Sequence, residues 1–115
     1  MIVSVSKGGQ YQWPECYGYS HPLAADPCPG SLIAPDFSTE ASTFVPTGAT
    51  FVDAAGLPGL AGHLVFCTFG DGGKIYTPGS PHGSVAPGPG NCRLDVKQGP
   101  DHALYYTDAG HIYRS

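Results

Sequence analysis

The sequence predicts an all-β protein made of about two blades of a β-propeller with long Pro/Gly-rich loops. Seventeen glycines and twelve prolines supply about a quarter of the 115 residues, yet hydrophobic residues reach 41%. The longest run without Gly or Pro, residues 36–45, is crowded with Ser and Thr, which disfavours helix. A repeat of about 40 residues with an aromatic-rich centre is the period of a propeller blade. Turn-dense β-sheet is therefore the expected fold class.

The repeat consists of two similar stretches. Residues 63–68 (HLVFCT) match residues 102–107 (HALYYT), and residues 73–76 (GKIY) match residues 110–113 (GHIY). Three short antiparallel strands cannot bury an apolar face alone, so each meander needs a neighbour. We therefore expect the two copies to form adjacent sheets that cover each other.

Taken in order, the chain divides into three parts. Residues 1–47 are expected to hold one strand, over residues 1–7, and a disulfide-closed loop, because apolar and polar residues alternate at the start. Residues 48–90 form the first blade, and residues 91–115 form an incomplete second blade. The expected strands cover residues 48–53, 64–69, 74–77, an outer strand around Val85, and residues 93–98, 103–107 and 111–114, with turns at residues 56–62, 99–102 and 108–110.

The four cysteines are predicted to form two disulfides. None lies in a C-x-x-C pair, which argues against a zinc ribbon, and four cysteines allow three pairings. We favour Cys16 with Cys28, closing a proline-rich loop, and Cys67 with Cys92, near strands that the repeat places in adjacent blades. Disulfides indicate an oxidising compartment, so a periplasmic or extracellular location is expected. Four buried free thiols in a cytosolic protein are the alternative.

Charge and hydropathy exclude several classes of partner. The net charge is −4 with only five scattered Lys and Arg residues, so no nucleic-acid or anionic-membrane footprint is expected. No apolar stretch approaches the roughly 20 residues of a membrane span. The residues also lack the glycine-rich fingerprint of a dinucleotide site and the G-x-S-x-G elbow of a hydrolase. No metal site is predicted either, because His21 and Asp26 have no third ligand at a recognisable spacing.

Two segments carry a resemblance to a known family. Residues 8–18 (GGQYQWPECYG) and residues 94–114, through LDV, GPDHALYYTD and IYR, resemble motifs of the glucose/sorbosone dehydrogenase family. That family consists of six-bladed, pyrroloquinoline-quinone (PQQ)-dependent sugar oxidoreductases. The resemblance covers nearly the whole chain and corresponds to the C-terminal third of the family. It implies a fragment or subunit of a PQQ-dependent aldose or sorbosone dehydrogenase.

The resemblance also implies candidate site residues. The family binds the quinone through Lys and Arg, and Lys74 and Arg93 are the candidates here, although both lie off the expected register and could be ordinary surface charges. The catalytic histidine of the family has no counterpart, so the chain alone is expected to be inactive. Candidate sugar-binding residues are Tyr11, Trp13, Phe44 and Thr47.

Each of these interpretations has a structural alternative. Tyr11 and Trp13 could stack on a sugar, but they are more simply expected to fill the gap between blades, since buried aromatic rings are common. For the whole chain, the alternative is a non-catalytic module that self-assembles through its blade edges. Two blades do not close a ring, so we expect either missing blades on a longer protein or a homo-oligomer, most simply three copies.

Overall fold

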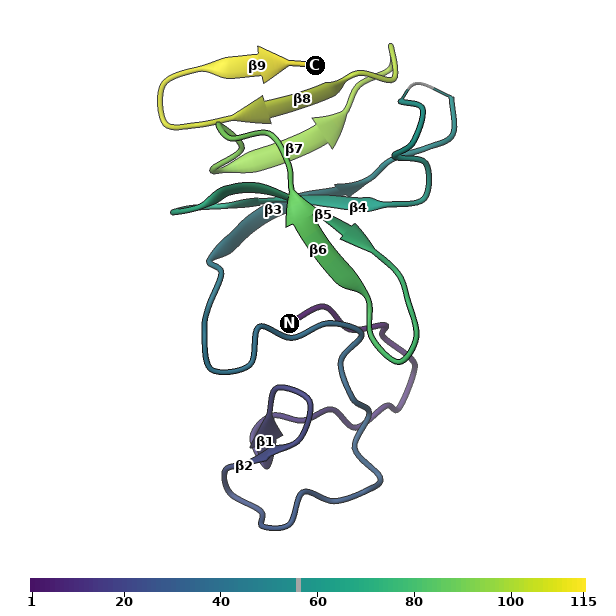
Figure 1. Cartoon of the computed structure of the whole chain (residues 1–115), viewed down its shortest axis with the longest axis vertical. Coiled ribbons are helices and arrows are strands. Elements are labelled where there is room, and N and C mark those ends of the chain that lie inside the picture. Colours follow the sequence, from purple (N-terminus) through teal and green to yellow (C-terminus); the bar gives the residue numbers. More distant parts are fainter. Residues whose placement is uncertain (56) are drawn as a thin grey trace. The chain divides into compact units, whose positions relative to one another are not determined.

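The computed structural model describes residues 1–55 and 57–115, which form nine β-strands and no helix (Figure 1). Gly56, the first residue of the turn predicted over residues 56–62, lies outside the described residues. The all-β class is confirmed. No helix in the described part of the chain could cross a membrane.

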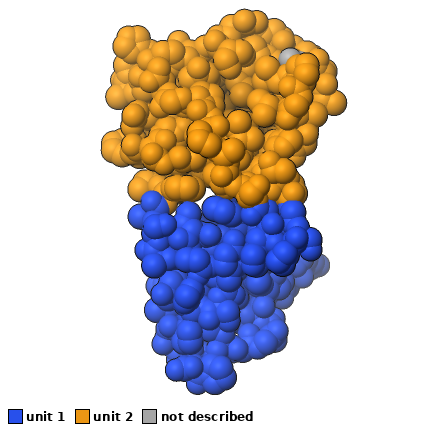
Figure 2. All heavy atoms as spheres, in the orientation of Figure 1, with its two compact units in different colours: residues 1–43, 79–83 blue, residues 44–78, 84–115 orange. Residues whose placement is uncertain are grey.

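The chain divides into two compact units (Figure 2). Unit 1 contains Met1–Thr43 and Gly79–Gly83, and unit 2 contains Phe44–Pro78 and Ser84–Ser115.

Unit 1 has little regular structure and is held by a disulfide and isolated bridges. Strands β1 (Cys16–Tyr17) and β2 (His21–Pro22) pair antiparallel, and Cys16 is bonded to Cys28, as predicted. The strand predicted over residues 1–7 does not form. Among residues 1–7, the β-type pairing in the structure is one isolated antiparallel bridge, between Ile2 and Phe37.

Unit 2 begins with a four-stranded antiparallel meander. Its strands are consecutive in space as in sequence: β3 (Pro46–Phe51), β4 (Leu64–Thr68), β5 (Gly72–Thr77) and β6 (Ser84–Pro87). The outer strand predicted around Val85 is confirmed as β6. β3 starts and ends two residues earlier than predicted, and its register with β4 shifts between Pro46 and Ala49.

The second sheet of unit 2 has three strands. These are β7 (Asp95–Gln98), β8 (Leu104–Thr107) and β9 (Ile112–Arg114), again in consecutive antiparallel order. β7 was predicted to start at Arg93. The backbone N–H groups of Arg93 and Leu94 both donate to the carbonyl of Thr107, so the regular ladder begins only at Asp95.

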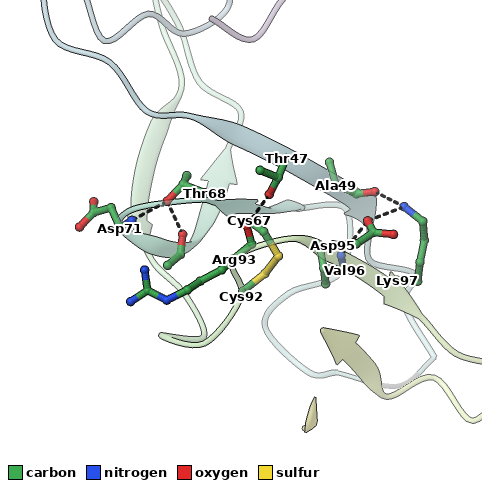
Figure 3. Close-up of a disulfide and its surroundings, with 11 residues drawn as sticks. Thr47, Ala49, Cys67, Thr68, Asp71, Cys92, Arg93, Asp95, Val96 and Lys97 are labelled. Atoms are coloured by element: carbon green, nitrogen blue, oxygen red, sulfur yellow. Dashed lines mark hydrogen bonds and ion pairs between the residues drawn. A yellow bond between two sulfur atoms is a disulfide. The ribbon is translucent and has the colours of Figure 1, made fainter. Parts of the chain in front are cut away.

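The two sheets of unit 2 pack together through their first strands. β7 contacts both β3 and β4. Val65 and Leu104, which occupy equivalent positions in the sequence repeat, both belong to the shared core, at 0% and 2% exposure. The predicted disulfide Cys67–Cys92 lies inside this core and ties the sheets together (Figure 3). The core consists of Val52, Val65, Cys67, Cys92, Val96 and Leu104.

Candidate functional site

The face of the first sheet opposite its core carries a shallow depression. Ala49, Phe66 and Lys74 are direct cross-strand partners on β3, β4 and β5, so their side chains share this face. Val65 and Cys67 alternate to the other face and enter the core. The depression has a volume of about 250 Å³ and is lined by Pro46, Thr47, Gly48, Ala49 and Phe66.

An aromatic pair and a lysine adjoin the depression. The rings of Phe44 and Phe66 lie 6.4 Å apart at an interplanar angle of 45°. Lys74 Nζ lies 5.0 Å from the centre of the Phe44 ring and forms an ion pair with Asp71. Only 12% of the Lys74 side chain is exposed, so its ammonium is already held between an aromatic face and a carboxylate.

Arg93 lies beside the disulfide that joins the two sheets. Its Nη1 donates to the carbonyl of Phe69 at 3.1 Å, and its own carbonyl accepts from the hydroxyl of Thr47 at 2.9 Å. The side chain extends away from the disulfide (Figure 3). Because a guanidinium has five N–H donors and the bond to Phe69 uses only one of them, Arg93 retains donors for an anion.

The structure therefore brings together four of the six residues predicted to bind quinone or sugar. Contacts within unit 2 link Phe44 to Lys74 and Thr47 to Arg93, and the two pairs flank the 69–71 turn. Neither pair was expected to be in contact, because the partners lie far apart in sequence.

The other two predicted residues, Tyr11 and Trp13, belong to unit 1. The hydroxyl of Tyr11 accepts from the N–H of Ser6 at 2.7 Å and donates to the carbonyl of Ser4 at 3.3 Å, so this ring closes a local turn. Trp13 is 72% exposed and does not fill a core. Neither ring is shown to fill a gap between blades: the Tyr11 hydroxyl is bonded within its own turn, and the Trp13 ring is exposed.

Three aspartates, two of them in predicted turns, have side-chain partners that sequence reasoning did not identify. Arg114 and the hydroxyl of Tyr105 both donate to Asp101, which lowers the pKa of that carboxyl and raises the pKa of the guanidinium. Asp53 accepts from the N–H of Ala55 and contacts the ring of His102, and these bonds lower its pKa. The turn predicted over residues 99–102 was the sequence signal for Asp101, and the turn predicted over residues 108–110 was the signal for Asp108.

Asp108 is the third of these aspartates and lies in the β8–β9 turn. It accepts backbone N–H bonds from Gly110 and His111, both at 2.8 Å, and a bond from the hydroxyl of Tyr113 at 2.8 Å. The Gly110 bond, followed by those from Tyr113 and His111, lowers the pKa of Asp108 to about 2. Donation to this carboxylate in turn raises the pKa of Tyr113. Together these bonds fix the turn.

No group of three or more His, Cys, Asp or Glu side chains in the described residues could hold a metal ion. Comparisons with family models, with curated proteins and with solved structures found no match.

Proposed function

We propose that the chain is a fragment or subunit of a PQQ-dependent aldose or sorbosone dehydrogenase-like oxidoreductase, to which it contributes about two propeller blades. The observation that carries the proposal is the contact between β3 and β7, the first strands of two successive antiparallel meanders. The blades of a propeller are likewise successive antiparallel sheets, arranged around a central channel. The two disulfides support export to the periplasm or beyond.

The residues present account for only part of a quinone site. PQQ carries three carboxylates, for which Arg93 offers a guanidinium with spare donors and Lys74 an ammonium already paired with Asp71. The adjoining depression of about 250 Å³ is below the roughly 300 Å³ at which small-molecule pockets begin. Quinone would supply the hydride acceptor, and further contacts and the base would come from other blades.

Quinone titration of the isolated chain tests the proposal. We expect weak, saturable binding that is reduced at least about tenfold in Arg93→Ala, because a charge-assisted bond is worth roughly 1.5–3 kcal/mol. Lys97→Ala is the matched control, since Lys97 is an exposed cation that bonds Ala49 and Asp95 instead. Dye-linked glucose oxidation should be absent for the chain alone. Binding that Arg93→Ala leaves unchanged, or no saturable binding, would contradict the quinone assignment.

A second candidate function is a non-catalytic module that self-assembles as a homo-oligomer. It is favoured by large apolar side chains left in solvent on strands of both sheets, with Phe51 on β3 73% exposed and Ile112 on β9 77% exposed. Exposed apolar residues on edge strands mark surfaces that meet another chain. Ordered oligomers without quinone binding would favour this candidate over the first.

A further inference from the structure

The outer edge of β9 presents free backbone hydrogen-bonding groups. Leu104 and Ser115 exchange two backbone bonds, of 3.1 and 2.9 Å, and hydrogen-bonded pairs alternate along an antiparallel ladder. The N–H and C=O groups of Ile112 and Arg114 therefore point away from β8. No other strand in the described part of the chain pairs with β9.

The first sheet shows how such an edge is filled. Its third strand, β5, pairs with β6 on the side away from β4. β9 is likewise the third strand of its meander, but the matching position beside it holds no strand among the described residues. β9 also lacks the usual protections of an edge, since it contains no proline and its one charge, Arg114, is bonded to Asp101 at 2.9 Å.

We propose that the edge of β9 pairs antiparallel with β9 of a second copy about a twofold axis at Tyr113. In this register Ile112 faces Arg114 of the second copy, and Arg114 faces Ile112 of the second copy. Both residues have outward N–H and C=O groups, so the two pairs can form four backbone hydrogen bonds. The edge is thus complementary to itself, which is the requirement of a twofold interface.

Side chains on the inner face fit the same register. Val96, Tyr106 and Tyr113 are cross-strand partners, and the two tyrosine rings stack with centroids 5.4 Å apart at 16°. The hydroxyl of Tyr113 is held by Asp108 at 2.8 Å, so the ring is ordered before pairing. The two Tyr113 residues would meet at a non-hydrogen-bonded position, where Cα atoms lie about 4.5 Å apart and side chains touch.

Charge and space permit the pairing. Each Arg114 stands opposite an apolar Ile112, not another arginine, and keeps its own Asp101. β7 is the strand of the second sheet that contacts the first sheet, so β9 lies on the far side (Figure 1). The contact between two three-residue edges is small, and we expect weak, concentration-dependent dimers, as for interfaces that bury less than about 1,200 Å².

The inference deepens the second candidate function by naming its partner and does not require quinone binding. Sedimentation velocity without quinone, from low to high concentration, is the test. Ile112→Pro removes an outward N–H together with the isoleucine side chain, and edge strands tolerate proline where the N–H faces solvent. The matched control, Ile112→Thr, keeps this N–H and loses the apolar side chain. We expect dimers of the parent chain and of Ile112→Thr, and affinity at least about tenfold lower for Ile112→Pro.

A second readout keeps the test independent of how well the proline variant folds. In the parent chain, the amide protons of Ile112 and Arg114 should exchange more slowly as concentration rises, whereas the amide of Tyr113, which points to β8, should be protected throughout. A mixed isotope-labelled sample should give an intermolecular contact between Tyr113 residues. A monomer at every concentration, a trimer, or concentration-independent exchange at Ile112 and Arg114 would overturn the proposal. Failure of quinone to bind would leave it unaffected.

Discussion

The hydroxyl of Thr47 donates a hydrogen bond of 2.9 Å to the backbone carbonyl of Arg93, 46 residues further along the chain. This bond joins β3 to the segment that leads into β7, beside the Cys67–Cys92 disulfide (Figure 3). It places Arg93, an exposed cation of the candidate site, at the junction of the two sheets. Changes at this junction should therefore affect both the stability of unit 2 and any anion binding by Arg93.

Gly48→Ala should destabilise unit 2. A β-carbon at Gly48 would lie 2.7 Å from the Cα of Asp95, so β3 and β7 would have to separate. We expect a loss of roughly 1–3 kcal/mol in the free energy of unfolding, as for other overpacked sites, measured by urea denaturation. Gly70→Ala is the control, because a β-carbon added there would meet no atom within 4 Å beyond its chain neighbours. Equal stability of the two variants would contradict the close approach of the sheets.

Removal of Cys67–Cys92 should cost more than removal of Cys16–Cys28. The first bridge spans 25 residues and lies in the core of unit 2, whereas the second spans 12 residues in unit 1. We expect Cys67→Ala with Cys92→Ala to lower the free energy of unfolding by roughly 3–4 kcal/mol. Amide exchange should show unit 2 unprotected in the variant that lacks Cys67–Cys92 and protected in the variant that lacks Cys16–Cys28.

Alkylation tests whether the two disulfides are present. The parent chain, alkylated without reductant, should show no mass shift, because no free thiol is available.

Acid should destabilise the β8–β9 turn through Asp108. The pKa of this carboxyl is about 2 in the folded chain and 3.8 ordinarily, so folding favours its charged form. Its stabilising contribution is complete above the ordinary pKa and is lost as the pH falls through about 2. Thermal unfolding of the parent chain between pH 4 and pH 2 should therefore show a fall in midpoint that is smaller in Asp108→Asn. Identical pH profiles would exclude this role.

Trp13 should report any sugar that binds unit 1. It is the only tryptophan of the chain and is 72% exposed, so its fluorescence is free of other indole signals. Stacking of a sugar on the ring would shift its emission to shorter wavelength in a saturable way during a glucose titration. Tyr11→Phe is the companion variant, because it removes the hydroxyl bonds to Ser4 and Ser6 but leaves Trp13 in place. Emission that does not change with glucose would exclude Trp13 as a sugar-binding residue.

The amino-acid sequence was sufficient for the features that depend on local chemistry or on the repeat. Gly and Pro spacing predicted the short strands and turns, and the match between Val65 and Leu104 predicted two sheets sharing a core. Both disulfides followed from the same repeat and from the proline-rich loop.

Strand register and the partners of charged groups were decided only by the tertiary structure. The sequence aligns Ile75 with Ile112, yet Ile75 pairs with Val65, whereas Ile112 pairs with Thr107, three residues beyond the equivalent of Val65. The two hairpins turn over different numbers of residues, and a match of residue types does not reveal where a backbone ladder resumes. Likewise, Lys74 lies against the ring of Phe44, which is 30 residues earlier in the chain. The two residues meet only once the first sheet has folded. Such contacts depend on distances between segments, which no local pattern encodes.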